Sequence, residues 1–276
     1  MSGELITRDL PNEVLDELAE AKQTLEHRGL ADRLTELIGA PITATFNLLP
    51  EAAESALQSA IDKSLKIALE VAVGTLGNET SGGKPKLVAH KLMAGLSGAA
   101  GGAFGLSAVA LELPVSTTII LRSVADIARS QGEDLALMDA RLACLEVFAI
   151  DGGSPKTNSE GTEIGYFAVR AAMSKQIADA SSYLLKHGLK ETAGPPLVQL
   201  LAFISKRFGV VVSQKVAVQA VPLIGALGGA LINSYFIDHY QDIARAHFTI
   251  RRLEREYGKA AIQEAYQSQP KRLTGS

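Results

Sequence analysis

Apolar residues recur three or four positions apart along most of the chain, which is the spacing of one face of a helix. The clearest case is the segment 51–76, EAAESALQSAIDKSLKIALEVAVGTL. Residues 12–28, 134–150 and 166–187 follow the same spacing, and the strict alternation of half-buried β-strands does not interrupt them. The pattern predicts an all-α fold, a multi-helix bundle.

Gly and Pro residues mark where these helices are expected to begin and end. Pro11 opens the first helix, and Gly188 closes the helix that begins at Tyr166. The polar stretches 77–86 and 151–161, GNETSGGKPK and DGGSPKTNSEG, are expected to be loops. Two short helices are expected in 194–215, and a final helix is expected in 238–258.

Two windows without a charged residue stand out, Leu92–Leu111 and Val216–Ile237. Each carries glycines four positions apart, which lie on one helical face and let helix backbones approach closely; the pairs are Gly98 with Gly102 and Gly225 with Gly229. About twenty apolar residues can span a bilayer, yet the Gly and Ala content makes these windows only weakly hydrophobic. Two interpretations stay open: helices lodged against a membrane, or close-packed core helices around which a bundle is built.

Glu112 and Pro114 follow the first window directly and are expected to mark a turn between two helices. Four polar residues near the window edges are candidates for a buried polar core or for ligand binding: Glu112, Arg122, Asp126 and Asn233. Arg122 and Asp126 are four apart on one helical face and are expected to pair. Because an unpaired buried charge is costly, Glu112 is expected to contact Asn233 or a ligand.

Composition narrows the classes of partner. The chain has 27 basic and 30 acidic residues and a formal net charge of −3, so no global field favours nucleic acid. Its single cysteine, Cys144, cannot form an internal disulfide and is expected to be a small buried hydrophobe. Residues 1–20 are acidic and lack the pattern of a signal peptide, so a cytoplasmic protein is expected.

Motifs of catalytic chemistry are sparse. Asp238, His239 and Asp242 have a helical spacing that could bring ligands to one cation. A solvated helix face and a structural polar network explain the same residues. No cofactor is predicted, and a metal at this cluster stays an open alternative. The sequence lacks a G-x-S-x-G elbow and an H-E-x-x-H motif, so an enzyme is disfavoured but left open.

Three segments carry a resemblance to a known family, and they read GLSGAAGGAFGLSAVALELPVSTTIILRSVADIARSQGEDL, YFAVRAAM and KVAVQAVPLIGALGGALINSYFIDHYQDIARAHF. In this order they resemble the EcsC family of bacterial proteins. The family has Asp more often where this chain has Glu112. The resemblance covers about residues 85–257, so residues 1–84 are expected to be a helical extension with a linker, and residues 258–276 a disordered tail. It implies an association with an ABC-type transporter but no defined activity.

Three functions are therefore expected as alternatives. The first is a membrane-associated accessory or regulatory protein, linked to a transport or secretion system, that docks peripherally on the inner face of the cell membrane through its Gly-rich helices. The second is a soluble helical protein that binds an apolar ligand, such as a lipid, between the two windows. The third is a metal-assisted enzyme. The expected partner is a membrane surface or lipid, and an oligomer is left open.

Overall fold

We describe the protein from a computed structural model, which defines residues 10–27, 30, 51–78, 106–150, 165–190, 194–219 and 222–269. Within these ranges every regular element is a helix, which confirms the predicted all-α fold. The elements are α1 (Asn12–His27), α4 (Glu51–Gly74), the 3₁₀ turn η2 (Leu76–Asn78), α6 (Leu106–Ser130), α7 (Met138–Glu146), α8 (Tyr166–His187), α9 (Pro195–Gln219), α10 (Pro222–Tyr257) and α11 (Lys259–Ser268).

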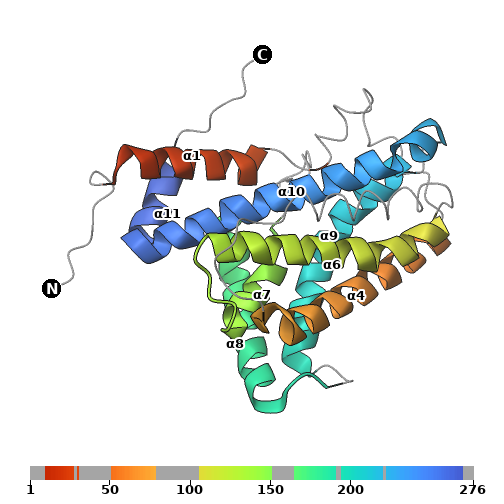
Figure 1. The fold of residues 1–276 in the computed structure, drawn as a ribbon, viewed down its shortest axis with the longest axis horizontal. Helices are drawn as coiled ribbons and strands as arrows, with labels where there is room; N and C mark the ends of the chain where they lie inside the picture. The colour runs from red at the N-terminus through yellow and green to blue at the C-terminus, as the bar shows by residue number, and fades with distance from the viewer. Residues whose placement is uncertain are drawn as a thin grey trace.

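The long helices α6 and α10 run side by side and in the same direction (Figure 1). Polar contacts fix this register. Glu112 in α6 and Asn233 in α10 share one partner, and the same number of residues further along, Gln131 accepts a hydrogen bond of 3.0 Å from Arg252. Helix α4 packs along α6 and α1 packs along α10, so apolar faces are buried between neighbouring helices.

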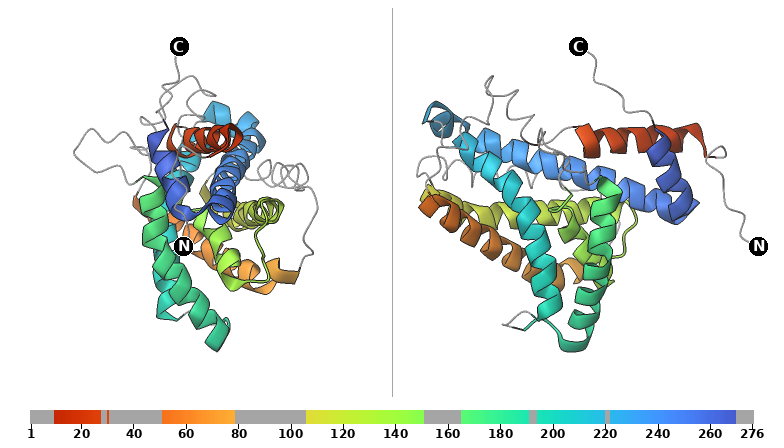
Figure 2. Two further views of the ribbon diagram at one scale, coloured as in Figure 1. Left: turned by 90° about the vertical axis from the view of Figure 1, so that its left-hand side faces the viewer. Right: turned by 180° about the vertical axis from the view of Figure 1, so that it is seen from behind.

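Helices α8 and α9 form a hairpin that projects from this pair (Figure 1). Helix α8 ends where predicted, at Gly188, whose φ of 66° lies in the left-handed region that favours glycine. Helix α9 then runs from the hairpin turn toward the end of the bundle where α10 begins (Figure 2, right). That end also holds the start of α6.

The prediction of two short helices in 194–215 is wrong, because α9 is continuous from Pro195 to Gln219. Gly209, near the middle of α9, stays helical and faces α4; a Cβ there would lie 3.6 Å from Ile61. A glycine costs a helix interior only about 1 kcal/mol. Burial of the apolar face of α9, which includes Leu200, Ile204 and Phe208, outweighs that cost.

Pro114 also lies inside a helix and does not mark the predicted turn. Proline removes one backbone donor and can kink a helix, but tertiary packing can hold the helix together across it. Two nearby hydroxyls bond to backbone carbonyls of this segment: Thr118 donates to Pro114 O at 2.8 Å, and Ser116 donates to Leu113 O at 3.2 Å. Pro222, by contrast, begins α10 as expected.

The first and last described helices, α1 and α11, pack against α10. In α1, the Lys22 ammonium donates at 2.9 Å to the backbone carbonyls of Tyr266 and Gln269. Tyr266 belongs to α11, a helix that lies where the sequence suggested a disordered tail. Helix α11 buries Ile262 and Ala265, whose spacing makes a short apolar face.

Among the described residues, α9 alone is long and apolar enough to cross a membrane, with a mean hydropathy of 1.4 over its most apolar stretch. In the folded chain 39% of that stretch is buried. Length and composition of this kind are shared by core helices of soluble proteins, so they do not by themselves assign α9 to a bilayer.

Candidate functional site

Three helices meet at a buried ion pair near the end of the bundle where α6 and α10 begin. The Lys215 ammonium of α9 donates to Glu112 Oε1 of α6 at 2.7 Å and to Asn233 Oδ1 of α10 at 2.9 Å. We call these three residues the polar junction. The side chains of Lys215 and Glu112 are only 1% and 4% exposed, so the pair is screened little by water.

Lys215 also contacts an aromatic ring. Its ammonium lies 4.6 Å from the centre of the Phe236 ring, a cation–π contact that satisfies its remaining side. Burial lowers the pKa of Lys215, although the neighbouring Glu112 carboxylate acts in the opposite direction. Removing one partner of such a pair would leave an uncompensated charge in the interior.

Glu112 and Asn233 were singled out from the sequence, whereas Lys215 was not. The structure brings all three together, with Lys215 as the residue that bonds to both others. A signal for Lys215 exists in the sequence, because it is a lone charge between the apolar runs Val210–Val212 and Val216–Val218. The helical pattern does not identify the partner of Lys215, because Glu112 belongs to a helix about a hundred residues earlier in the chain.

Arg122 and Asp126, the expected i,i+4 pair, lie further along α6 and away from the junction. Asp126 accepts a hydrogen bond of 2.8 Å from Arg129. Arg129 also donates to the Leu76 carbonyl of η2, and Arg122 lies 3.5 Å from the Thr75 hydroxyl. These contacts connect α6 to the end of α4.

The residues proposed as metal ligands lie in the middle of α10. His239 is buried, and Asp242 accepts a hydrogen bond of 2.6 Å from Arg245. Across the described ranges, no three His, Cys, Asp or Glu side chains gather as a group that could hold a metal ion. The metal alternative therefore gains no support from Asp238, His239 and Asp242.

The Gly-rich pairs are only partly described. Gly98 and Gly102 lie outside the described residues. Gly225 and Gly229 belong to the first turns of α10, in a stretch whose packing also lies outside the description. The predicted close approach of two Gly-rich faces thus stays a prediction.

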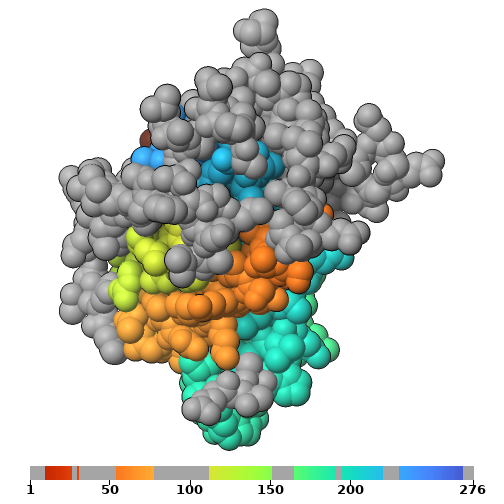
Figure 3. Space-filling view, turned by 90° about the vertical axis from the view of Figure 1, so that its right-hand side faces the viewer, coloured from red at the N-terminus to blue at the C-terminus, as the bar shows by residue number. Residues whose placement is uncertain are grey.

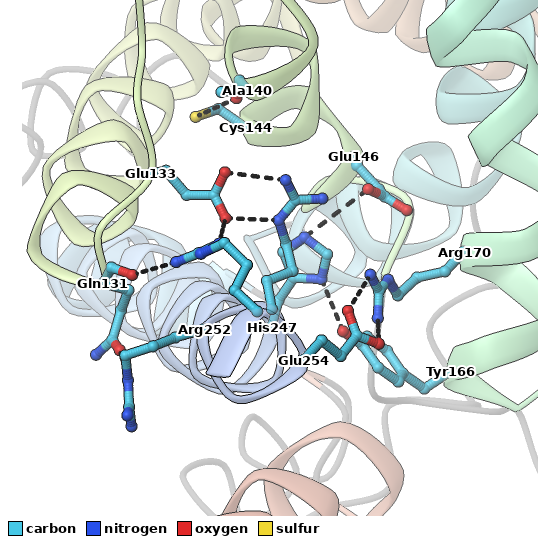
Figure 4. Close-up of polar contacts among 12 residues, drawn as sticks. Gln131, Glu133, Ala140, Cys144, Glu146, Tyr166, Arg170, His247, Arg252 and Glu254 are labelled. Carbon is cyan, nitrogen blue, oxygen red and sulfur yellow. Dashed lines mark hydrogen bonds and ion pairs between the residues drawn. The ribbon is translucent and has the colours of Figure 1, made fainter. Parts of the chain in front are cut away.

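A second buried group of polar side chains lies near the other end of α10. The Tyr166 hydroxyl and His247 Nδ1 are 2.9 Å apart, and His247 Nε2 lies 3.8 Å from Glu146 Oε2. Figure 4 shows the His247 ring between the other two side chains, which come from α8 and from the end of α7. We call Glu146, Tyr166 and His247 the imidazole cluster.

Two ion pairs flank the imidazole cluster. Arg170 donates through both terminal nitrogens to Glu254, at 2.8 and 2.9 Å, and its guanidinium lies over the Tyr166 ring (Figure 4). Arg251 makes a second two-bond contact, at 2.8 and 2.9 Å, with Glu133. Such forked pairs hold both partners in a fixed geometry.

Burial shifts the pKa values inside this cluster. It raises the pKa of Glu146 to about 7, although Arg170 and Arg251 act in the opposite direction. Burial lowers the pKa of His247 well below its ordinary value, and the same two arginines lower it further. Glu133 differs, because Arg251 and Arg255 outweigh the effect of burial and lower its pKa.

The cluster has unused hydrogen-bonding capacity. Glu146 Oε1 and His247 Nε2 are buried, and neither has a hydrogen-bond partner among the described residues. The 3.8 Å between Glu146 and His247 is longer than a hydrogen bond, so a small movement of either side chain would form one. When Glu146 carries a proton, it can share it with the neutral imidazole.

The sequence did not predict that Glu146, Tyr166 and His247 form one buried polar group. Glu146 lies in the apolar segment LACLEVFAI, where a single charge was the available signal. Cys144, two residues earlier, is buried as predicted. Burial raises the pKa of its thiol to about 12, so it is not a reactive thiolate.

A comparison with protein-family models matches residues 12–253 to the EcsC protein family. The match begins well before residue 85, where the sequence resemblance was expected to start, and so it includes α1 and α4. This agrees with the packing of both helices on the central pair. No curated protein and no solved structure matches the chain.

Proposed function

We propose that this chain, which belongs to the EcsC protein family, is a membrane-associated helical protein that docks on the cytoplasmic face of the cell membrane. Docking occurs through the end of the bundle formed by the start of α6, the last turns of α9 and the start of α10, which we call the apolar end. In this role the protein is an accessory or regulatory component beside a membrane transport system. The resemblance described above favours an ABC-type transporter.

The polar junction carries this proposal. From Glu112, Lys215 and Asn233 toward this end of the bundle, the described stretches 106–111, 216–219 and 222–232 contain no charged residue. The ion pair therefore lies at the base of an apolar end and joins the three helices that form it. A buried pair of this kind contributes little net stability, but it fixes which helices meet and in what register.

Exposed aliphatic side chains also lie close to the polar junction in the sequence of each helix. Each helix of the junction exposes one within two turns of its junction residue: Val115 of α6 and Leu231 of α10 are each 48% exposed, and Val210 of α9 is 45% exposed. Figure 3 looks toward this end, where parts of α4, α6, α9 and α10 reach the surface. Apolar surface that gathers in one region is typical of a contact with a membrane or a partner.

Cell fractionation of the protein at its native level tests the proposal. We expect it in the membrane pellet and expect alkaline carbonate to release it, because a docked protein has no segment that crosses the bilayer. Recovery in the soluble fraction from the start would contradict membrane association. Resistance to carbonate would contradict surface docking and indicate embedded segments.

A matched pair of variants tests the surface itself. Val115→Asp combined with Leu231→Asp introduces charges at the apolar end, and we expect it to move the protein to the soluble fraction. Leu137→Asp is the control, because Leu137 is an exposed aliphatic residue in the connection between α6 and α7, away from the apolar end. Equal loss of membrane binding in both proteins would contradict the assignment of this end.

A further inference from the structure

The turn region of the α8–α9 hairpin exposes aliphatic side chains. Leu185 of α8 is 73% exposed, Leu189 in the turn is 37% exposed, and Val198 of α9 is 53% exposed. Single exposed aliphatic residues are common on soluble proteins, but these three share one projecting hairpin (Figure 1). Nothing in the described structure covers them.

The charges of the hairpin are mainly basic where it is exposed. Lys186 and Lys190 flank the turn, and Lys206 lies on the exposed side of α9. Helix α9 contains no acidic residue along its whole length, although Glu191 follows Lys190 in the sequence. Lysines beside exposed aliphatic residues are typical of helices that lie in the interface of an anionic membrane.

The outer side of α9 continues this surface away from the turn. Val198, Ala202, Lys206 and Val210 are exposed and four positions apart, so they follow one side of the helix. The opposite side is held in the fold by buried residues such as Phe208 and by Lys215 at the polar junction. Helix α9 is apolar enough to cross a bilayer, but these contacts favour a helix that lies along the surface.

We propose that the outer face of the hairpin, formed by Leu185, Leu189, Val198 and Val210 together with Lys186, Lys190 and Lys206, rests on an anionic lipid surface. The inference deepens the proposed function and depends on it, since α9 runs from the hairpin turn to the apolar end (Figure 2, right). The aliphatic side chains enter the headgroup region, and the lysines contact the anionic headgroups.

Vesicle flotation of the full chain tests this face. We expect the protein to float with vesicles of phosphatidylcholine and phosphatidylglycerol and to bind vesicles of phosphatidylcholine alone far more weakly. Added salt weakens the binding, because it screens the lysines. Each lysine near an anionic surface strengthens binding by about fivefold, so replacing all three with Gln is expected to weaken it by roughly 100-fold.

Two controls isolate the face. Lys63→Gln removes an exposed lysine from α4 and is expected to leave flotation unchanged. The double variant Leu185→Ser, Val198→Ser tests the aliphatic side chains of the hairpin face and is expected to bind vesicles more weakly. The control Leu137→Ser is expected to bind as the wild type does. Circular dichroism of each variant verifies that the helices are intact, which is expected because all of these side chains are exposed.

The outcomes separate this inference from the function on which it rests. If the three-lysine variant floats as well as the wild type while Val115→Asp with Leu231→Asp fails to float, the hairpin face is wrong and the apolar end stands. If the protein pellets with cell membranes but binds no anionic vesicle, the lipid assignment is wrong. If it neither pellets with membranes nor floats, both proposals fail. A dimer abolished by the Leu185 and Val198 changes would mean that a second copy covers this face, which also overturns the inference.

Discussion

The carboxyl group of Glu146 and the imidazole of His247 lie 3.8 Å apart in the interior, and burial shifts their pKa values in opposite directions. Each shift favours the neutral form of its group, because a charge is costly in a poorly solvated site. Near pH 7 the pair is therefore a neutral imidazole beside a carboxyl group that is about half protonated. The two groups affect stability in opposite ways as the pH changes.

The Glu146→Gln variant is expected to gain stability relative to the wild type as the pH rises. In the folded protein the Glu146 carboxyl keeps its proton up to about pH 7, whereas in the unfolded chain it loses the proton near pH 4.5. The wild type therefore loses stability as the pH rises between these two values. Gln stays neutral throughout. The gain above pH 7 is at most about 3 kcal/mol, measured by urea unfolding over this range. Two parallel stability curves would contradict the shifted pKa.

The His247→Asn variant is expected to show the opposite trend. Unfolded His247 binds a proton below about pH 6.5 and the buried imidazole does not, so the wild type loses stability as the pH falls. Asn does not bind a proton in this pH range, and its side-chain amide can still form a hydrogen bond with the Tyr166 hydroxyl. The difference in unfolding free energy between the variant and the wild type should therefore change in favour of the variant as the pH falls. Loss of the imidazole ring lowers the stability of the variant by a similar amount at every pH. A difference that grows toward alkaline pH would refute this assignment.

The Lys215→Met variant is expected to lose about 3–5 kcal/mol of unfolding free energy, because Glu112 would stay buried without its partner. Combining it with Glu112→Leu removes both charges and should recover most of that loss. Urea unfolding of the two single variants and the double variant gives the coupling energy directly. Independent, additive effects would show that the junction is not a coupled pair.

The Arg170→Ala variant is expected to destabilise the fold much more than Arg245→Ala. Arg170 is largely buried and binds Glu254 through two hydrogen bonds, so its loss should cost about 3 kcal/mol or more. Arg245 pairs with Asp242 on an exposed part of α10, where a pair contributes less than about 1 kcal/mol. Thermal unfolding of both variants tests this, and similar losses would contradict it.

Some features of the fold follow from local sequence. Helical spacing of apolar residues was enough for the all-α class, for α1 and for the end of α8 at Gly188. The same local reasoning failed for the two short helices expected in 194–215 and for the turn expected at Pro114, because α9 and α6 continue through these positions. The local preference of a glycine or proline for ending a helix amounts to only a few kcal/mol. Burial of apolar side chains against neighbouring helices can exceed it and therefore decides whether the helix continues.

Burial of a side chain was easier to anticipate than its partner. A charged residue within an apolar helical pattern is expected to be buried and to need an ion-pair or hydrogen-bond partner. Glu112 was identified in this way. Lys215 and the imidazole cluster were missed because the same signal does not say which distant helix supplies the other group. Tyr166 and His247, for example, are 81 positions apart in the chain.

The sequence by itself determined the helical class and, through its motifs, membership of the EcsC family, because helical periodicity and family motifs are carried by residues close together in the chain. Only the tertiary structure decided that Lys215 joins Glu112 to Asn233 and that His247 lies between Tyr166 and Glu146. These contacts depend on how five helices, α6 to α10, pack in space. The energy of that packing is summed over many small apolar contacts that no single residue in the sequence displays.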